Sequence, residues 1–412
     1  MFQGVMNIVY KVTDIEKAKQ WYGKILNAEP ILDIAFITVF RIGDVNLGLL
    51  QSTNPETNIK DNNIIYWKVD DIDTAYKRLL EAGATKYNEI ESGGFGTKRA
   101  SVIDPFGNIL GIASKTDETI IKTVEQKPSR TAMGIAFLRA LAYKDERDEI
   151  RGSDYLAEIF LTEEQKASIK DKAIFDGLNN SRPGIYEFIT ARTAFFDHIV
   201  KQALIDNIPQ IVCLGAGYDT RAYRFRDLIK DTEIFEVDIN TTQQYKKELL
   251  QKSNIDIPKH LTYVSINFNK DKLKDVLSRA GYSKDKKTLF IWEGVIYYLL
   301  PKAVEDTLDF IRSNSLVGSR ICFDYAFTSP DMYSLYGVKQ FSEYMRTNHP
   351  DESARFGIAK GKIDMFLSER GFKLIEHLNA DDMEKKYLTL QDGSSVGKVL
   401  GNFCLVDASV VG

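Results

Sequence analysis

Two glycines stand where an apolar strand turns into a helix, in the segment IVCLGAGYDTRAYRF. Gly215 and Gly217 flank Ala216 directly after the apolar run 211–214. Glycine suits such a turn, because the backbone there takes dihedral angles that other residues resist and passes close to a ligand. A dinucleotide-binding turn would need a third glycine where Thr220 stands, which disfavours an NAD site. The pattern alone also fits an ordinary tight turn.

Polar side chains end the strands that follow. The strand TEIFEVDI ends near Asp238, HLTYVSI is followed by Asn267 and Phe268, and KTLFIWEG ends near Glu293. A carboxylate at the end of the second strand can accept hydrogen bonds from ribose hydroxyls. The alternative is that Asp238 only caps the next helix. Glu293 lies inside an apolar run, where a lone carboxylate is costly without a partner, and this favours a functional role.

Alternating strands and helices must position these side chains. Between the strands lie the helical runs TTQQYKKELLQ, KDKLKDVLSRAG and PKAVEDTLDFIRS. This alternation predicts an α/β fold with a doubly wound parallel sheet, whose ligand binds at the carboxyl ends of the strands. Upstream, PGIYEFITARTAFFDHIVKQAL is typical of a long helix that begins at Pro183.

An internal repeat occupies the N-terminal region. The segments IVYKVTDIEKAKQWYGKIL from Ile8 and IYWKVDDIDTAYKRLL from Ile65 share several residues in register. Each copy is typical of a strand, an aspartate N-cap and an amphipathic helix, with further strands after it. DPFG at Asp104–Gly107 is a turn signal. The repeat predicts an α+β domain of two tandem βαβββ modules.

Composition excludes several classes of protein. The 412 residues suffice for two or three domains, and we expect a first domain at 1–115, a polar linker at 116–128 and a second domain at 129–412. The net charge of −4 lacks the basic excess of nucleic-acid-binding proteins. The sequence shows no apolar run of the ~18 residues that cross a bilayer, no secretion signal and no CxxC spacing. These features predict a cytoplasmic protein that binds neither membranes nor nucleic acid.

The second domain resembles the leucine carboxyl methyltransferase-like family of class I S-adenosylmethionine-dependent methyltransferases. The strings LGAGYDTRAYRF, FEVD and FIWEGVIYYL carry the resemblance, with SRTA, DYLAEIFL, ITARTAFFD and ARFG, over roughly residues 129–407. The resemblance implies a Rossmann-like sheet and S-adenosylmethionine as the cofactor. The turn Gly215, Ala216, Gly217 would approach the methionine part of that cofactor.

The resemblance also implies roles for other matching residues. Arg192, in the string ART, would pair with the carboxylate of the cofactor, although an ion pair on the helix surface is an alternative. Asp238 would hold the ribose, and Glu293 would lie beside the amino group and the methyl-donor end. Relatives commonly place an aspartate against the adenine amino group after the third strand. Here Asn267 stands at that place, followed by Phe268.

The repeat resembles the vicinal oxygen chelate superfamily of glyoxalases and bleomycin-resistance proteins, through its V-x-D-I-x-x-A helix starts and its DPFGN turn. Catalytic members of that superfamily hold a metal with His and Glu side chains. The matching places here are Asn7, Ile64 and Gly111, and residues 1–130 contain neither His nor Cys. Isoleucine and glycine side chains cannot donate to a metal. We therefore expect no metal here, and a binding, assembly or structural role for this domain.

The methyl acceptor is less well defined by the sequence. Family members roof the acceptor pocket with N-terminal helices and with an insertion after strand five, here the aromatic-rich segment 328–361. Tyr298 and Arg355 could clamp an acceptor, and His349 is the one histidine placed to reach it, although a solvent-facing turn residue is its alternative. Because no clear general base is found, an oxygen already ionised at neutral pH is the expected nucleophile.

We therefore predict an S-adenosylmethionine-dependent O-methyltransferase that acts on a carboxylate of a small molecule or short peptide. The candidates for the catalytic side are Glu293, Tyr298, His349 and Arg355. A hydroxyl-directed O-methyltransferase of secondary metabolism and a non-catalytic binding or resistance protein are the alternatives. The oligomeric state is open, and a homodimer is one option.

Overall fold

The computed structural model describes residues 7–34, 36–43, 45–52, 64–94, 97–115, 129–169, 177–178, 180–268, 271–349 and 354–412. The chain divides into two compact units, Met1–Asp117 and Glu118–Gly412, which we call the N-terminal unit and the C-terminal unit. The linker expected at 116–128 lies outside the described residues.

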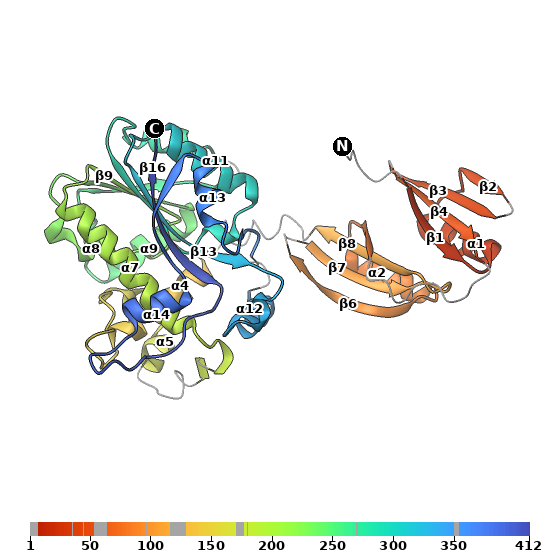
Figure 1. Cartoon of the computed structure of the whole chain (residues 1–412), viewed down its shortest axis with the longest axis horizontal. Helices are drawn as coiled ribbons and strands as arrows, with labels where there is room; N and C mark the ends of the chain where they lie inside the picture. Colours follow the sequence, from red (N-terminus) through yellow and green to blue (C-terminus); the bar gives the residue numbers. More distant parts are fainter. Residues whose placement is uncertain are drawn as a thin grey trace. The chain divides into compact units, whose positions relative to one another are not determined.

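The N-terminal unit consists of two βαβββ modules with the same strand order (Figure 1). In each module the first strand pairs in parallel with the last strand, and the second strand lies at the far edge. The predicted tandem repeat is thereby confirmed. The elements are β1 (Asn7–Val12), α1 (Ile15–Leu26), β2 (Leu32–Ile34), β3 (Ile37–Ile42), β4 (Val45–Gln51), β5 (Ile65–Lys68), α2 (Ile72–Glu81), β6 (Thr85–Gly94), β7 (Thr97–Ile103) and β8 (Ile109–Lys115).

The two helices of this unit begin at the aspartates that the repeat predicts. Asp14 and Asp71 each accept a hydrogen bond from a backbone N–H in the first turn of their helix, at 3.1 Å in both cases. These bonds satisfy donors that a helix N-terminus leaves unpaired. The modules also contact each other, because Tyr22 of α1 donates a hydrogen bond to Asp104 of the second module at 2.6 Å. The two modules therefore share one core.

The C-terminal unit is built on a sheet with the strand order β11-β10-β9-β12-β13-β16-β15, and β14 pairs with β13. Strands β9 to β13 are parallel, and β16 is antiparallel to both of its neighbours. This confirms the predicted doubly wound sheet. The strands are β9 (Gln210–Leu214), β10 (Glu233–Asp238), β11 (Leu261–Ser265), β12 (Thr288–Trp292), β13 (Arg320–Thr328), β14 (Ile358–Ala359), β15 (Phe372–Leu378) and β16 (Phe403–Val410).

Helix α7 (Ile185–Ile205) is buried along most of its length and contacts β12, β16, α4 (Arg130–Tyr143) and α14 (Ala380–Tyr387) (Figure 1). The other helices are η1 (Ala157–Phe160), α5 (Glu163–Ser168), α8 (Arg221–Arg224), η2 (Arg226–Leu228), α9 (Asn240–Lys252), α10 (Leu273–Arg279), η3 (Ile296–Tyr298), α11 (Pro301–Ser313), η4 (Met332–Ser334), α12 (Val338–Asn348) and α13 (Ile363–Ser368). Among the described residues, no helix is both long enough and apolar enough to span a bilayer.

The strand order places the ligand-binding edge of the sheet. The chain leaves β9 toward β10 and β11 on one side and returns to β12 and β13 on the other. In such sheets the crevice lies at the carboxyl ends of the strands, where the order reverses. The ends of β9 and β12 are therefore where a bound molecule is expected.

Candidate active site

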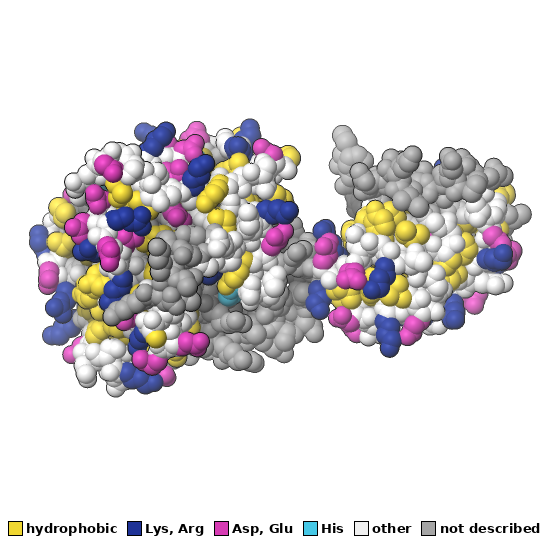
Figure 2. Space-filling view, turned by 90° about the horizontal axis from the view of Figure 1, so that it is seen from below, with side chains coloured by type: hydrophobic (Ala, Val, Ile, Leu, Met, Phe, Trp, Pro, Cys, Tyr) yellow, Lys and Arg dark blue, Asp and Glu magenta, His cyan; other side chains and the backbone are white. Residues whose placement is uncertain are grey.

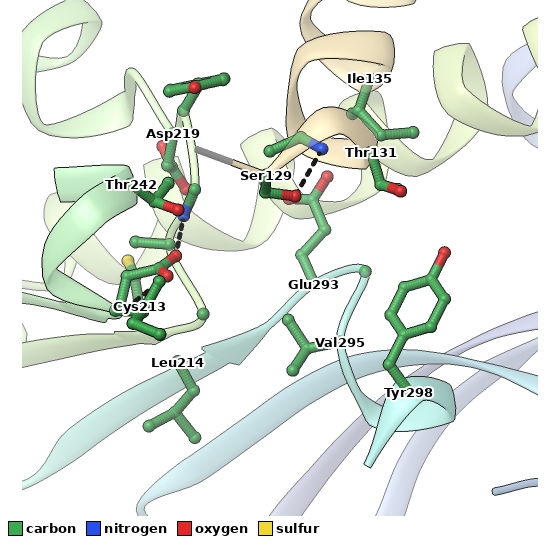
Figure 3. A pocket seen from close by; sticks show the side chains of 18 of the residues that line it. Ser129, Thr131, Ile135, Cys213, Leu214, Asp219, Thr242, Glu293, Val295 and Tyr298 are labelled. Atoms are coloured by element: carbon green, nitrogen blue, oxygen red, sulfur yellow. Dashed lines mark hydrogen bonds between the residues drawn. The ribbon is translucent and has the colours of Figure 1, made fainter. Parts of the chain in front are cut away.

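A cavity of about 310 Å³ lies at the carboxyl ends of β9, β10, β11 and β12 (Figure 3). The first turns of α4 and the segment around η3 complete its wall. The structure brings together every predicted site residue except His349, and those that line the cavity are Arg192, Gly215, Ala216, Gly217, Asp238, Asn267, Phe268, Glu293, Tyr298 and Arg355. Residues far apart in the sequence thus meet at the edge that the strand order selects.

His349 is not brought to this cavity. It is the C-cap residue of α12, where its backbone N–H donates to Met345 at 2.8 Å. Its half-buried ring lies 5.8 Å from the ring of Tyr344, measured between centroids. The last turn of α12 fixes this position, and no histidine lines the cavity within the described ranges. The placement agrees with the alternative of a turn residue.

The two positions of the turn after β9 require glycine for different reasons. Both glycines have positive φ, +68° at Gly215 and +50° at Gly217, a conformation that other residues adopt with strain. A Cβ at position 215 would also overlap the side chain of Val295, whereas a Cβ at 217 would meet only Ala132, at 3.4 Å. Close packing against a neighbouring loop, in addition to any ligand, therefore requires Gly215.

Asp238 is held by backbone donors at the end of β10. Its carboxylate accepts from the N–H of Gly217 at 2.5 Å and from the N–H of Ile239 at 2.6 Å. It does not cap α9, whose N-cap residue is Ile239 and has no side-chain cap. Burial raises the pKa of Asp238, and the two N–H donors offset part of that rise. A carboxylate can accept about four hydrogen bonds, so Asp238 has capacity left for ribose hydroxyls.

Glu293 has the partners that a buried carboxylate needs. Its Oε1 lies 3.1 Å from Nε of Arg192, and its Oε2 lies 2.8 Å from Nη1 of Arg221. Figure 3 shows the side chain pointing from the sheet toward the first turn of α4, where Ser129 and Thr131 lie. Arg192 itself is buried in the wall rather than on the helix surface. Its Nη2 donates no hydrogen bond within the described part of the chain, so it retains donors for a ligand carboxylate.

These residues belong to a longer chain of buried ion pairs. Burial opposes ionisation of Asp197, but Arg224 and Arg221 outweigh it and lower its pKa. The five carboxylates and four guanidinium groups of this ion-pair network sum to a net charge of −1, which favours a cationic ligand nearby. Its members, in order of contact, are Arg139, Asp154, Arg224, Asp197, Arg221, Asp219, Glu293, Arg192 and Asp324.

Several wall residues were missed by the sequence analysis. Helix α4 and its N-cap contribute Ser129, Thr131, Ile135 and Arg139, although the string SRTA was noted as a family feature. Asp324 was also missed, and it does not line the cavity but pairs with a residue that does. The sequence did carry a signal for Asp324. Like Glu293, it is a lone carboxylate within an apolar run.

The cavity suits an adenosine linked to an amino acid. Three buried hydroxyls of its wall, those of Thr131, Tyr218 and Thr242, have no hydrogen-bond partner in the described structure. Buried polar groups without partners are rare unless a ligand or water completes them. The hydroxyls of Tyr218 and Thr242, together with Asp238, would serve the adenosine, while Arg192 and Glu293 carry the charges that complement a carboxylate and an ammonium group. The residues present therefore fit S-adenosylmethionine.

The described part of the N-terminal unit shows no site for a metal ion. Within its described ranges, no group of three or more His, Cys, Asp or Glu side chains could hold a metal ion. A Cβ added to Gly111 would lie only 2.8 Å from side-chain atoms of Ile64 and Tyr66. A ligating side chain at position 111 therefore has no room in this packing. Asn7 begins β1, and its side chain is not among those described.

Comparisons with known proteins match both units. The family model "Leucine carboxyl methyltransferase" matches residues 132–312, and the model "Glyoxalase/Bleomycin resistance protein/Dioxygenase superfamily" matches residues 5–112. The "Putative S-adenosyl-L-methionine-dependent methyltransferase YktD" of Bacillus subtilis is 30% identical, over 55% of this chain and 77% of that protein. A similarly named protein of Mycolicibacterium gilvum is 33% identical, over 41% of this chain and 68% of its own length.

Two solved structures are similar to parts of this chain. A putative methyltransferase from Thermobifida fusca covers 69% of this chain and 96% of its own, with 14% identity and a TM-score of 0.45. A glyoxalase-related enzyme from Fulvimarina pelagi covers 27% of this chain and 88% of its own, with 20% identity and a TM-score of 0.24.

Proposed function

Because the chain belongs to the leucine carboxyl methyltransferase family of S-adenosylmethionine-dependent methyltransferases, we propose that it methylates a carboxylate oxygen of a small molecule or short peptide. The observation that carries this proposal is the placement of Arg355. It lines the cavity, and no carboxylate in the described part of the chain pairs with it. An unpaired guanidinium at the wall favours an acceptor that brings a carboxylate of its own.

The other groups of the cavity argue against activation of a hydroxyl. A phenol or alcohol normally needs a positioned base, whereas a carboxylate is already ionised at neutral pH. Glu293 is held by two arginines, and Asp219 pairs with Arg221 at 2.7 Å. Burial raises the pKa of Tyr218 far above neutrality, so its hydroxyl stays protonated. None of these groups is a good proton acceptor for a neutral substrate.

In this proposal catalysis is mainly a matter of position. S-adenosylmethionine, when bound, supplies a sulfonium methyl group that an oxygen nucleophile can take directly. Arg192 and Glu293 hold the amino-acid end of the cofactor, and Asp238 holds its ribose. Arg355 and Tyr298 orient the acceptor carboxylate. Holding two reactants in a fixed geometry lowers the barrier by removing their freedom to move apart.

The chemical identity of the product tests the proposal. The full-length protein is incubated with methyl-labelled S-adenosylmethionine and with panels of small carboxylic acids, dipeptides, alcohols and phenols. The label is expected in methyl esters, which mild base hydrolyses to methanol. Label in base-stable ethers, from the alcohols or phenols alone, would contradict a carboxylate acceptor.

An Arg355→Gln variant refines the same test. We expect KM for the acceptor acid to rise by about tenfold to a hundredfold, as for a lost charged hydrogen bond, while cofactor affinity stays unchanged. Arg226→Gln, which removes an exposed arginine on η2 that does not line the cavity, is the matched control and should leave KM unchanged. Turnover of the parent should vary little between about pH 6 and 9, since the acceptor needs no base.

For the N-terminal unit we propose a metal-free role in substrate binding or assembly. The packing of Gly111 against Ile64 supports the absence of a metal, and the two modules retain a shared apolar core.

We also propose that the protein is cytoplasmic. This location is supported by three cysteines, Cys213, Cys322 and Cys404, that are buried and form no disulfide.

A further inference from the structure

Asp324 joins two parts of the cavity wall without lining the cavity itself. It is fully buried in β13. Its Oδ2 accepts a hydrogen bond from Nη1 of Arg192 at 2.9 Å, and its Oδ1 accepts from the backbone N–H of Gly294 at 2.6 Å. One carboxylate thus holds a side chain from α7 and the backbone that follows β12.

The two groups that Asp324 holds are packed against each other. Gly294 has a φ of +75°, and a Cβ there would lie 3.2 Å from Nη1 of Arg192. Glu293 immediately precedes Gly294, so the turn that Asp324 fixes also sets the direction of the Glu293 side chain. A fully buried carboxylate is costly to desolvate. Here it is compensated mainly by Arg192 and the Gly294 backbone, and the hydroxyl of Tyr297 donates a longer hydrogen bond to Oδ2, at 3.4 Å.

We propose that Asp324 is a positioning residue for the amino-acid end of S-adenosylmethionine. It acts mainly by fixing Arg192 and to a lesser extent by fixing the Gly294 turn, so that Arg192 and Glu293 are in place before the cofactor arrives. It makes no contact with the adenosine end, which Asp238 and its neighbours serve. The role concerns the methyl donor and is independent of which acceptor the enzyme methylates.

Two ligands separate this role from a general structural one. S-adenosylhomocysteine carries both ends of the cofactor, whereas 5′-methylthioadenosine lacks the amino-acid end. Calorimetry on the full-length protein measures the affinity for each ligand. In Asp324→Asn, the affinity for S-adenosylhomocysteine should fall by about tenfold to a hundredfold, the size of a lost charged hydrogen bond. Its affinity for 5′-methylthioadenosine should be unchanged.

Asp407→Asn is the matched control. Asp407 is a buried aspartate on the adjacent strand β16, opposite Cys322, and pairs with Arg320 rather than with a cavity residue. This variant should leave both affinities unchanged even if it lowers stability. The proposal would be overturned if Asp324→Asn lost the same affinity for both ligands, or lost affinity for neither.

A second pair of variants keeps the test decisive if Asp324→Asn does not fold. Arg192→Gln and the double variant Arg192→Gln/Asp324→Asn should lose the same amount of affinity for S-adenosylhomocysteine, because Asp324 acts largely through Arg192. The double variant removes one charge of each sign. Affinity for 5′-methylthioadenosine should persist in both. A further large loss in the double variant would contradict the assigned route.

Discussion

Glu293 and Arg355 are two charged residues of the same cavity, and they differ in whether a residue of opposite charge lies beside them. Glu293 lies within ion-pair distance of Arg192 and Arg221, whereas Arg355 has no such partner in the described structure. A ligand carboxylate near Arg355 gains an ion pair, but near Glu293 it meets a like charge. In the proposed function, this difference between individual residues distinguishes the end of the cavity that binds the methyl donor from the end that binds the acceptor.

The glycine turn gives a prediction for a single residue. Gly215→Ala should lower the free energy of unfolding by about 2–4 kcal/mol, because the added Cβ overlaps Val295 and the backbone φ is positive. Gly281→Ala is the control, since Gly281 also has positive φ but nothing lies within 4 Å of a Cβ there. Denaturant unfolding compares the two variants. Addition of Val295→Ala should restore part of the loss, and equal losses in both alanine variants would refute the steric explanation.

Whether the role of a single residue could be predicted from the sequence depends on which contacts hold that residue in place. Asp238 and Glu293 were found because they end strands, and strand ends are visible in the local pattern. The role of Asp324 was not found, because its partner Arg192 is 132 positions away on a helix. Spacing along the chain reports nothing about such a tertiary pair. His349 was a candidate because it lies in the insertion expected to roof the acceptor pocket, but the end of α12 keeps it away from the cavity.

At the scale of elements, buried ion pairs hold short segments in place. Helix α8 (Arg221–Arg224) has only four residues, far too few to be stable alone. Arg221 and Arg224 pair with Asp197 of α7 at 2.7 and 2.8 Å. The segment that positions Arg221 against Glu293 is therefore fixed by side chains rather than by helix propensity. The sequence showed that a helix follows the glycine turn but not this support.

Removal of that support gives the second prediction. Asp197→Asn should destabilise the protein by about 3–5 kcal/mol, because it leaves buried guanidinium groups without their carboxylate. Asp309→Asn, which breaks an exposed pair with Arg312, should cost about 0–1 kcal/mol. Chemical unfolding measures both. If the two variants are equally stable, the buried pairs do not have the importance assigned to them.

The pairing of β10 with α9 gives a prediction for pH. Burial raises the pKa of Glu236 to about 7, and Lys246, which is 2.5 Å away, offsets part of the rise. An unfolded glutamate titrates near ~4.3, so the folded state holds the proton more tightly. Its stabilising contribution is complete below about pH 4 and is lost as the pH rises through about 7.

The free energy of unfolding should therefore fall from about pH 5 to pH 8 more steeply in the parent than in Glu236→Gln. Denaturant unfolding at several pH values gives both slopes. The comparison cancels the titration of groups common to the two proteins. Parallel slopes would show that Glu236 is ionised throughout this range.

At the scale of the whole molecule, the architecture was largely predictable. The tandem repeat and the strand–helix alternation are local patterns, and each specifies a fold class on its own. What the N-terminal unit binds was not predictable, since Ile64 and Gly111 occupy the superfamily's metal-ligand places. On the face shown in Figure 2, basic and acidic side chains of the C-terminal unit are interspersed rather than gathered by sign. That pattern fits small-molecule chemistry better than a polyanionic partner.

The N-terminal unit leads to a prediction about metals. Elemental analysis of the purified full-length protein should show no stoichiometric zinc, iron, nickel or manganese, because a ligating side chain has no room at Gly111. Treatment with a chelator should leave methyl transfer unchanged. One equivalent of a tightly held transition metal, lost together with activity on chelation, would contradict this account.

Calorimetric titration of the full-length protein with S-adenosylmethionine tests the central claim most directly, because the assigned cavity either binds the methyl donor or does not. We expect one equivalent to bind per chain, and Asp238→Ala to weaken binding by about tenfold to a hundredfold through lost hydrogen bonds to a charged acceptor. Asp407→Asn should bind as the parent does. No binding to the parent, or equally tight binding to Asp238→Ala, would contradict the placement of the methyl donor at the carboxyl ends of β9, β10 and β12.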